Sequence, residues 1–256
     1  MRSTARLAAL IGIVALSLAG CGSSPTGSAG QPGSTATGEI TVFAAASLTE
    51  SFTRLGADFE AANPGARVKF NFAGSSALAQ QLNQGAPADV FAAAAPANMK
   101  QVADAATPTT FARNRLQIAV PKGNPGKVTG LADFGKPDRK IALCAEQVPC
   151  GAAAKKVFGI AGITAAPDTL EQDVKAVLTK VKLGEVDAAL VYRTDVRAAG
   201  DQVEGIAFPE ADQAVNDYPI AALAKAPNAA GARAFVDFVL SAKGREVLTA
   251  AGFDSP

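Results

Sequence analysis

The stretch Gly38–Phe52 changes from the periodicity of a β-strand to that of an α-helix within a few residues. Ile40, Val42 and Phe43 fit a buried strand that ends in a run of alanines. Apolar side chains then recur at helical spacing, at Leu48, Phe52, Leu55 and Phe59. The change falls at Ser47, so the sequence predicts a strand, a tight turn and a helix that opens at Ser47.

Two interpretations of Ser47 stay open on this evidence. A helix N-terminus carries unpaired N–H groups and a partial positive charge, so a turn built from Ala and Ser can hold an anion. The spacing of Ser47 and Glu50 also matches a capping box, in which the serine only satisfies a backbone amide of its own helix.

The same construction recurs twice along the chain. The strand 67–72 leads through Ser75 and Ser76 into a helix with Leu78 and Leu82 on one face, and no capping box is available there. The strand 140–144 leads through a turn at Cys150 into a helix of small residues. Further strands are predicted at 89–93, 115–120, 187–192, 203–207 and 220–224, and further helices at 174–181, 228–240 and 242–250.

Strands that alternate with helices predict an α/β fold with parallel sheets. Ligands of such folds bind at the carboxyl ends of strands, where helix N-termini converge. Ser47, Ser75, Cys150 and Tyr192 all lie at strand ends or helix starts. Spacing alone does not bring these four residues together.

The first 38 residues have the composition of a leader and a linker. Residues 1–20 carry Arg2 and Arg6 before an apolar run, and Cys21 follows small residues, which resembles a lipoprotein signal peptide. The apolar run is shorter than the ~20 residues that a membrane-spanning anchor needs. We therefore expect export, lipidation at Cys21 and anchoring to the outer face of the cytoplasmic membrane, with residues 21–38 as a flexible tether.

Charge and composition exclude several functions. Removal of Arg2 and Arg6 takes the formal charge from +1 to −1, and no basic run suggests nucleic acid as a partner. The chain contains no histidine, so a Ser-His-Asp triad cannot form and zinc loses its usual nitrogen ligand. An exported hydrolase would need a Ser–Lys pair, and no lysine is close in sequence to Ser47 or Ser75. A surface lipoprotein that binds other proteins remains an alternative.

Two cysteines remain after Cys21. Cys144 and Cys150 would then form a pair in a compartment that permits disulfides, so we expect a bridge between them. Two thiols without a further Cys or a His make a poor metal site.

Five segments in order resemble the molybdate-binding proteins of molybdate ABC importers: residues 41–52 (TVFAAASLTESF), 72–94, 148–157, 171–195 and 208–223. The resemblance implies a two-lobed type II periplasmic-binding-protein fold, each lobe a mainly parallel sheet flanked by helices, with a ligand cleft between the lobes. It places residues 39–118 plus 219–256 in lobe 1 and residues 119–218 in lobe 2. The chain would cross between the lobes near Ala119–Pro121 and near Tyr218.

The resemblance also implies a ligand set: the hydroxyls of Ser47, Ser75 and Tyr192 and the backbone N–H groups of Cys150 and Val174. Cys150 stands where this family often has alanine. The implied function is capture of molybdate, with tungstate or another oxyanion as alternatives, and delivery to the permease of an ABC importer with its ATPase. It further implies a monomer that is not an enzyme and needs no cofactor. The only metal expected is the one within the oxyanion.

Overall fold

This computed structural model describes residues 36–105 and 107–256. The predicted signal peptide, Cys21 and most of the predicted tether lie outside the described residues. The prediction that the tether extends to Gly38 is wrong at its end. Ala36 is buried, with its N–H donated to Asn63 Oδ1 at 3.1 Å, and Gly38 begins the first strand.

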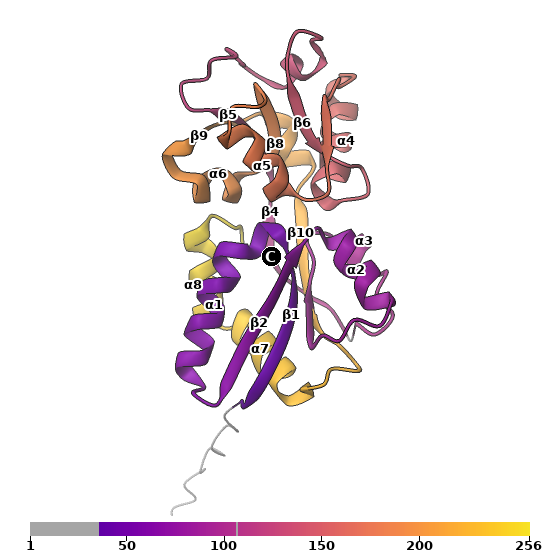
Figure 1. The fold of residues 1–256 in the computed structure, drawn as a ribbon, viewed down its shortest axis with the longest axis vertical. Coiled ribbons are helices and arrows are strands. Elements are labelled where there is room, and N and C mark those ends of the chain that lie inside the picture. The colour runs from indigo at the N-terminus through magenta and orange to yellow at the C-terminus, as the bar shows by residue number, and fades with distance from the viewer. Residues whose placement is uncertain (1–35, 106) are drawn as a thin grey trace, which may run out of the picture. The chain divides into compact units, whose positions relative to one another are not determined.

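The first sheet contains five strands in the order β2-β1-β3-β10-β4 (Figure 1). These strands are β1 (Gly38–Ala45), β2 (Ala66–Ala73), β3 (Val90–Ala92), β4 (Thr109–Asn114) and β10 (Asn216–Ala222). Strands β2 and β3 run parallel to β1, whereas β10 runs antiparallel to both β3 and β4. The helices of this lobe are α1 (Thr49–Ala62), α2 (Ser75–Asn83), α3 (Pro96–Met99), α7 (Ala229–Leu240) and α8 (Ala242–Ala251).

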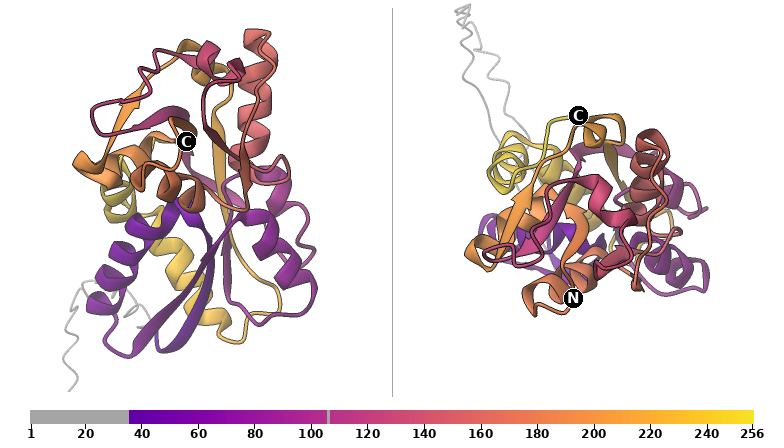
Figure 2. Two further views of the ribbon diagram at one scale, coloured as in Figure 1. Left: turned by 45° about the horizontal axis from the view of Figure 1, so that its top comes forward. Right: turned by 90° about the horizontal axis from the view of Figure 1, so that it is seen from above.

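The two faces of the first sheet are covered by different helices. Val42 packs with α1, α7 and α8, in a core that includes the edge-to-face aromatic pair Phe59–Phe235. Phe43, which points to the opposite face, packs with α2 and α3 through Leu78 and Met99. The turned views of Figure 2 show the indigo and yellow helices together on one side. The alternation read from the sequence of β1 is therefore the alternation of two buried faces.

The second sheet has the order β7-β6-β8-β5-β9. Its strands are β5 (Leu116–Pro121), β6 (Ile141–Cys144), β7 (Thr169–Glu171), β8 (Ala188–Tyr192) and β9 (Val203–Ile206). The helices α4 (Pro149–Ala161), α5 (Val174–Lys182) and α6 (Arg193–Ala199) pack on it. Strands β7 and β8 run parallel to β6, and β5 is antiparallel to β8 and β9. One hydrophobic core, drawn entirely from residues 116–214, holds this lobe together.

The chain passes between the sheets at two neighbouring points. β4 ends at Asn114 and β5 begins at Leu116, so the first passage is at Arg115 rather than near Ala119–Pro121 as predicted. The return is complete by Asn216, which already pairs with Asn114 in the first sheet, so the boundary predicted after Tyr218 also falls too late. A buried apolar strand such as 116–121 has the same pattern in either lobe. Only its pairing with β8 and β9 assigns it.

Two strands, β4 and β7, were not predicted. The first helix was predicted to open at Ser47, but it begins two residues later. Residues 46–48 form a short 3-10 turn, and α1 follows from Thr49. Within the part of the chain that the structure describes, no helix combines the length and the apolar character needed to cross a bilayer.

Candidate functional site

One small cavity lies at the ends of strands from both sheets and has a volume of about 10 Å³. Its lining contains all five residues expected to bind a ligand: Ser47, Ser75, Cys150, Val174 and Tyr192. The other residues of its wall are Ala45, Ala46, Gly74, Ala94, Val148, Pro149 and Asp173. The fold thus brings together residues that are far apart in sequence. This joint placement was implied by the family resemblance and could not be obtained from spacing.

The cavity wall is built mainly from the first residues of helices. Ser75 opens α2, Cys150 is the second residue of α4, and Val174 opens α5. The N–H groups at such positions have no partner within their own helix, and the helix dipoles add partial positive charge. Helix starts from both lobes therefore face one space, as an anion site requires.

Ser47 does not act as a helix cap. No side-chain cap hydrogen bond is present at the start of α1. Instead, the Ser47 Oγ atom lies 2.9 Å from the Tyr218 hydroxyl. Burial raises the pKa of Tyr218, so this phenol keeps its proton. Either hydroxyl can donate in this bond, and when Tyr218 donates to Ser47 Oγ, the hydrogen of the serine hydroxyl is free to point into the cavity.

The Ser75 hydroxyl can also donate a hydrogen bond into the cavity, for a different reason. Its Oγ atom accepts a hydrogen bond from the backbone N–H of Ala94 at 2.9 Å. Because the hydroxyl accepts from Ala94, its own hydrogen is left to be donated. Ala94 is in turn held by Asn216, whose side-chain amide donates to the Ala94 carbonyl at 2.9 Å.

Tyr192 supplies the clearest sign of a ligand. Its side chain is 1% exposed, yet its hydroxyl has no hydrogen-bond partner among the described residues. Burial raises the pKa of this phenol well above its ordinary value, with smaller contributions from Tyr218 and Asp195. The group is therefore a protonated donor. A buried polar atom left unpaired costs about 1–3 kcal/mol, and an acceptor in the adjoining cavity would remove that cost.

The predicted disulfide is present at the edge of this cavity. Cys144, the last residue of β6, is bonded to Cys150 in the first turn of α4, with their Cα atoms 5.7 Å apart. Gly151 tightens the same turn, because a Cβ atom there would lie 1.9 Å from the Ala145 carbonyl oxygen. The backbone N–H of Cys150 is thus held by a covalent link and by close packing.

At the start of α5 the backbone amides are divided between a cap and the cavity. The Asp173 carboxylate accepts from the N–H groups of Lys175 and Ala176, at 2.8 and 3.0 Å. The N–H of Val174, the first residue of the helix, takes no part in this cap. The Asp173 carboxylate therefore caps its own helix, although the residue also lines the cavity.

Sequence reasoning missed a charged group beside the cavity. Lys175 Nζ lies 2.8 Å from Glu50 Oε1, on α1, and 3.0 Å from Asp195 Oδ1, on α6. Asp195 is fully buried and its Oδ2 atom accepts from the Tyr192 N–H at 3.1 Å. Burial raises the pKa of Asp195 to about 6, against the opposing effect of Lys175. Neither residue lies in a motif that marks an ion pair, so only the structure could reveal this group.

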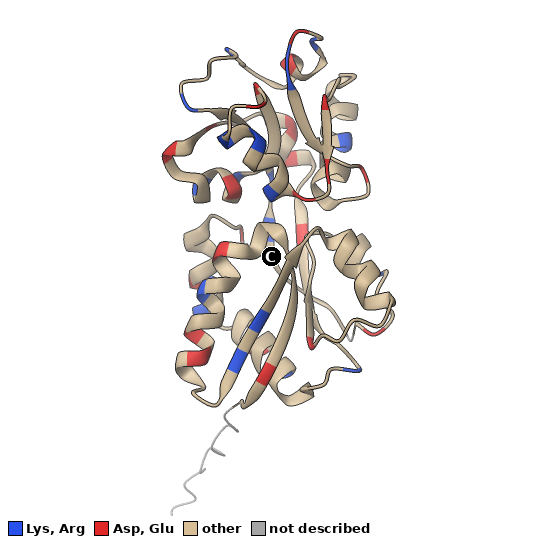
Figure 3. Ribbon diagram, in the orientation of Figure 1, with Lys and Arg blue, Asp and Glu red and all other residues tan. Residues whose placement is uncertain are grey.

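The cavity itself is lined by no lysine or arginine. Charged residues of both signs are spread along the ribbon of both lobes instead (Figure 3). The cavity therefore offers hydroxyls and backbone amides as donors, and among the described residues no group of three or more Cys, Asp or Glu side chains could hold a bare metal ion. Such a site suits an oxyanion that accepts hydrogen bonds at every oxygen.

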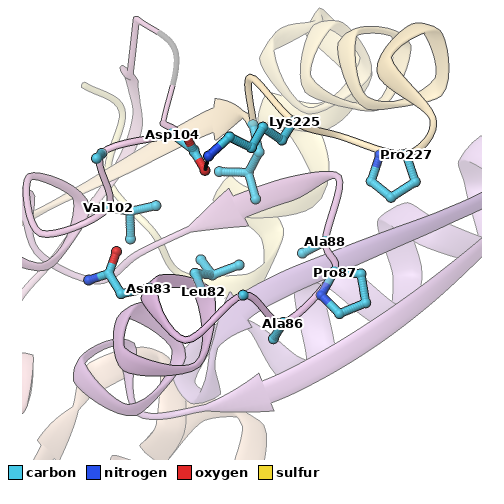
Figure 4. A pocket seen from close by; sticks show the side chains of 12 residues that line it. Leu82, Asn83, Ala86, Pro87, Ala88, Val102, Asp104, Lys225 and Pro227 are labelled. Atoms are coloured by element: carbon cyan, nitrogen blue, oxygen red, sulfur yellow. Dashed lines mark ion pairs between the residues drawn. The ribbon is translucent and has the colours of Figure 1, made fainter.

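A second, larger hollow lies on the first lobe, away from these residues. Its wall includes Leu82, Val102 and the ion pair between Asp104 and Lys225 (Figure 4). None of the unpaired buried polar atoms of the described residues belongs to it. No feature of this hollow therefore indicates a ligand.

Comparison with known proteins agrees with this geometry. Residues 40–254 match the model of the family described as bacterial extracellular solute-binding protein. The chain is 45% identical to the molybdate-binding protein ModA of Mycobacterium tuberculosis, over 93% of each chain. It is 32% identical to the molybdate-binding protein ModA of Escherichia coli, over 84% of this chain and 89% of that one.

The fold matches a solved structure, the periplasmic molybdate-binding protein of Azotobacter vinelandii, with a TM-score of 0.73 at 21% identity. The match covers 85% of this chain and 99% of that one. At this identity the likeness shows the fold, the two-lobed α/β type II architecture predicted from the sequence. The chain therefore belongs to the bacterial extracellular solute-binding proteins, a family of binding proteins rather than enzymes, and within it to the ModA family.

Proposed function

We propose that the protein binds molybdate in the cavity between its lobes and delivers it to an ABC importer. The observation that carries this proposal is the set of hydrogen-bond donors around one small space. The hydroxyls of Ser47, Ser75 and Tyr192 and the backbone amides of Cys150 and Val174 line it, and its lining includes no Lys or Arg side chain. The curated relatives at 45% and 32% identity are named molybdate-binding proteins, which supports the same ligand.

Size and protonation define the anion class. Pockets for organic ligands usually measure about 300–1,000 Å³, and this cavity, at about 10 Å³, is far smaller, so it fits a small inorganic ion better than an organic ligand. A site made of donors favours an anion without protons, because an anion's own O–H would find no acceptor, at a cost of about 1–3 kcal/mol. Molybdate and tungstate satisfy both conditions, and they are larger than sulfate.

Calorimetric titration of the protein with molybdate, tungstate, sulfate and phosphate tests this proposal. We expect tight binding of the two larger anions, a rise in melting temperature with each, and no competition from sulfate at large excess. A surface lipoprotein that binds only other proteins would give no thermal shift with any of the four. Displacement of molybdate by sulfate would show that the ligand is a different oxyanion.

The proposal includes lipid anchoring at Cys21, which rests on the sequence alone. The intact-mass spectrum of the membrane-extracted protein should show a chain that begins at an acylated Cys21, and Cys21→Ser should release the protein from the membrane. A membrane-bound Cys21→Ser variant would refute the anchor but leave the proposed ligand untouched.

A further inference from the structure

Gly74 is a point at which the two lobes meet closely beside the cavity. It precedes α2 in the first lobe, and a Cβ atom there would lie 2.3 Å from the Gln172 carbonyl oxygen and 2.9 Å from Val148 Cγ1. Gln172 and Val148 both belong to the second lobe. Among the described glycines, Gly74 is the one whose added Cβ would come within 3.0 Å of the opposite lobe.

This contact cannot be tightened by any natural substitution. Glycine is the smallest residue, and the nearest atom across the contact belongs to backbone, which cannot rotate away as a side chain does. Gly74 and Val148 also line the cavity, so the contact lies in the cavity wall. The distance between the lobes at this point therefore fixes the smallest volume that the cavity can adopt.

The Glu50–Lys175 ion pair draws the lobes together at another point. Its two residues lie on α1 of the first lobe and α5 of the second, and α5 also contacts the turn that carries Ser47. The ion pair attracts the lobes toward each other, and the contact at Gly74 prevents them from approaching further. Together they define one separation of the two lobes in the closed protein.

We propose that Gly74 is a closure stop that sets the size of anion the protein selects. The inference rests on the proposed function. An anion large enough to span the gap reaches the donors of both lobes at once. A smaller anion leaves donors of one lobe unpaired, because the lobes cannot approach further to meet it.

Gly74→Ala tests the stop directly. The added methyl group should hold the lobes apart and weaken molybdate binding about tenfold or more, the usual effect of forcing an extra carbon into a packed contact. Sulfate binding, which does not use the donors of both lobes, should change little, so the preference for molybdate over sulfate should fall by the same factor. Small-angle X-ray scattering should show a smaller decrease in radius of gyration on molybdate addition than in the unaltered protein.

Gly159→Ala is the matched control, because its Cβ atom would meet nothing within 4 Å. It should leave both affinities and the decrease in radius of gyration unchanged. If Gly74→Ala does not fold, Val148→Ile adds one carbon to the same contact from the other lobe and should weaken molybdate in the same direction.

The outcomes separate this inference from the proposed function. Molybdate affinity and compaction in Gly74→Ala equal to those of the unaltered protein would refute the stop and leave the function standing. Equal loss of molybdate and sulfate affinity would also refute it, because the residue would then act on anions of every size. Failure of the unaltered protein to bind molybdate would overturn both.

Discussion

Lys175 Nζ lies 2.8 Å from each carboxylate oxygen of Glu50, so an ion pair joins the two lobes directly beside Val174, whose backbone N–H is a proposed ligand donor. The lysine is 23% exposed and the glutamate 54%. Lys175 is also paired with the buried Asp195, which raises the lysine pKa against the lowering effect of burial. The pair with Asp195 stays within one lobe, and the pair with Glu50 forms only when the lobes meet.

We predict that Glu50→Gln weakens molybdate binding by about two- to fivefold, the range of partly exposed ion pairs. The loss should shrink as salt is added, because salt screens the interaction in the unaltered protein. Calorimetry at low and high ionic strength measures it. Glu39→Gln is the control, since Glu39 pairs with Lys69 within one lobe and should leave affinity unchanged.

Tyr192→Phe should separate ligand binding from stability. Loss of a hydrogen bond to a charged ligand should weaken molybdate by about 1.5–3 kcal/mol, whereas the ligand-free protein should be as stable as before or more so, because its hydroxyl is unpaired. Tyr218→Phe should instead lower the melting temperature of the ligand-free protein, since it removes the bond to Ser47. Equal molybdate affinity in Tyr192→Phe would exclude this hydroxyl from the site.

Replacing Cys144 and Cys150 together by Ala should destabilise the protein by about 2 kcal/mol on the chain-entropy model for so short a loop. For a protein of this size that corresponds to a melting temperature lower by about 4–8 °C. Molybdate affinity should fall as well, because the Cys150 N–H is no longer fixed. Thermal unfolding and calorimetry would show the two effects, and an unchanged affinity would mean that packing at Gly151 alone holds the turn.

Asp133 should control stability in acid. Burial alone would raise its pKa, but hydrogen bonds from Lys136, Thr129 and Gly130 outweigh burial and lower the pKa to about 2. A carboxyl with a lowered pKa stabilises the fold above its ordinary pKa of 3.8, and this contribution is lost as pH falls through about 2.

Asp133→Asn should therefore lower the free energy of unfolding in urea at pH 7 by about 1 kcal/mol, because solvent screening reduces the full effect of the pKa shift, and the difference from the unaltered protein should shrink toward pH 2. Asp201→Asn, at an exposed ion pair, should cost little at either pH. A constant difference across the pH range would assign the loss to packing.

Much of the fold was predictable because most strands and helices have a clear local period. The switch at Ser47 and the face formed by Val177, Leu178 and Val181 are local signals, and the structure buries that face. The sheet to which β5 belongs could not be predicted, because the sequence of a buried strand does not indicate which strands it pairs with. The edge strand β7 escaped prediction because it is three residues long and partly exposed.

The residues of the candidate site could be predicted, but the hydrogen bonds and ion pairs that orient them could not. The family resemblance named Ser47 and Tyr192, but it gave no hint that Tyr218 bonds to the serine or that the Tyr192 hydroxyl is unpaired. The sequence also allowed a capping box at Ser47, because Glu50 stands three residues later. In the structure that glutamate bonds to Lys175 of the other lobe, a contact between residues 125 positions apart that local pattern cannot show.

The central place of β10 in the first sheet bears on the order in which the lobes can form during synthesis. Residues 116–214 are contiguous and contain every strand of the second sheet, so that lobe is complete before β10 has been made. The first sheet consists of two unconnected parts until Asn216–Ala222 arrives and joins β3 to β4. The lobe that begins the chain is therefore the last to finish, and the anion cavity forms only when that late strand is in place.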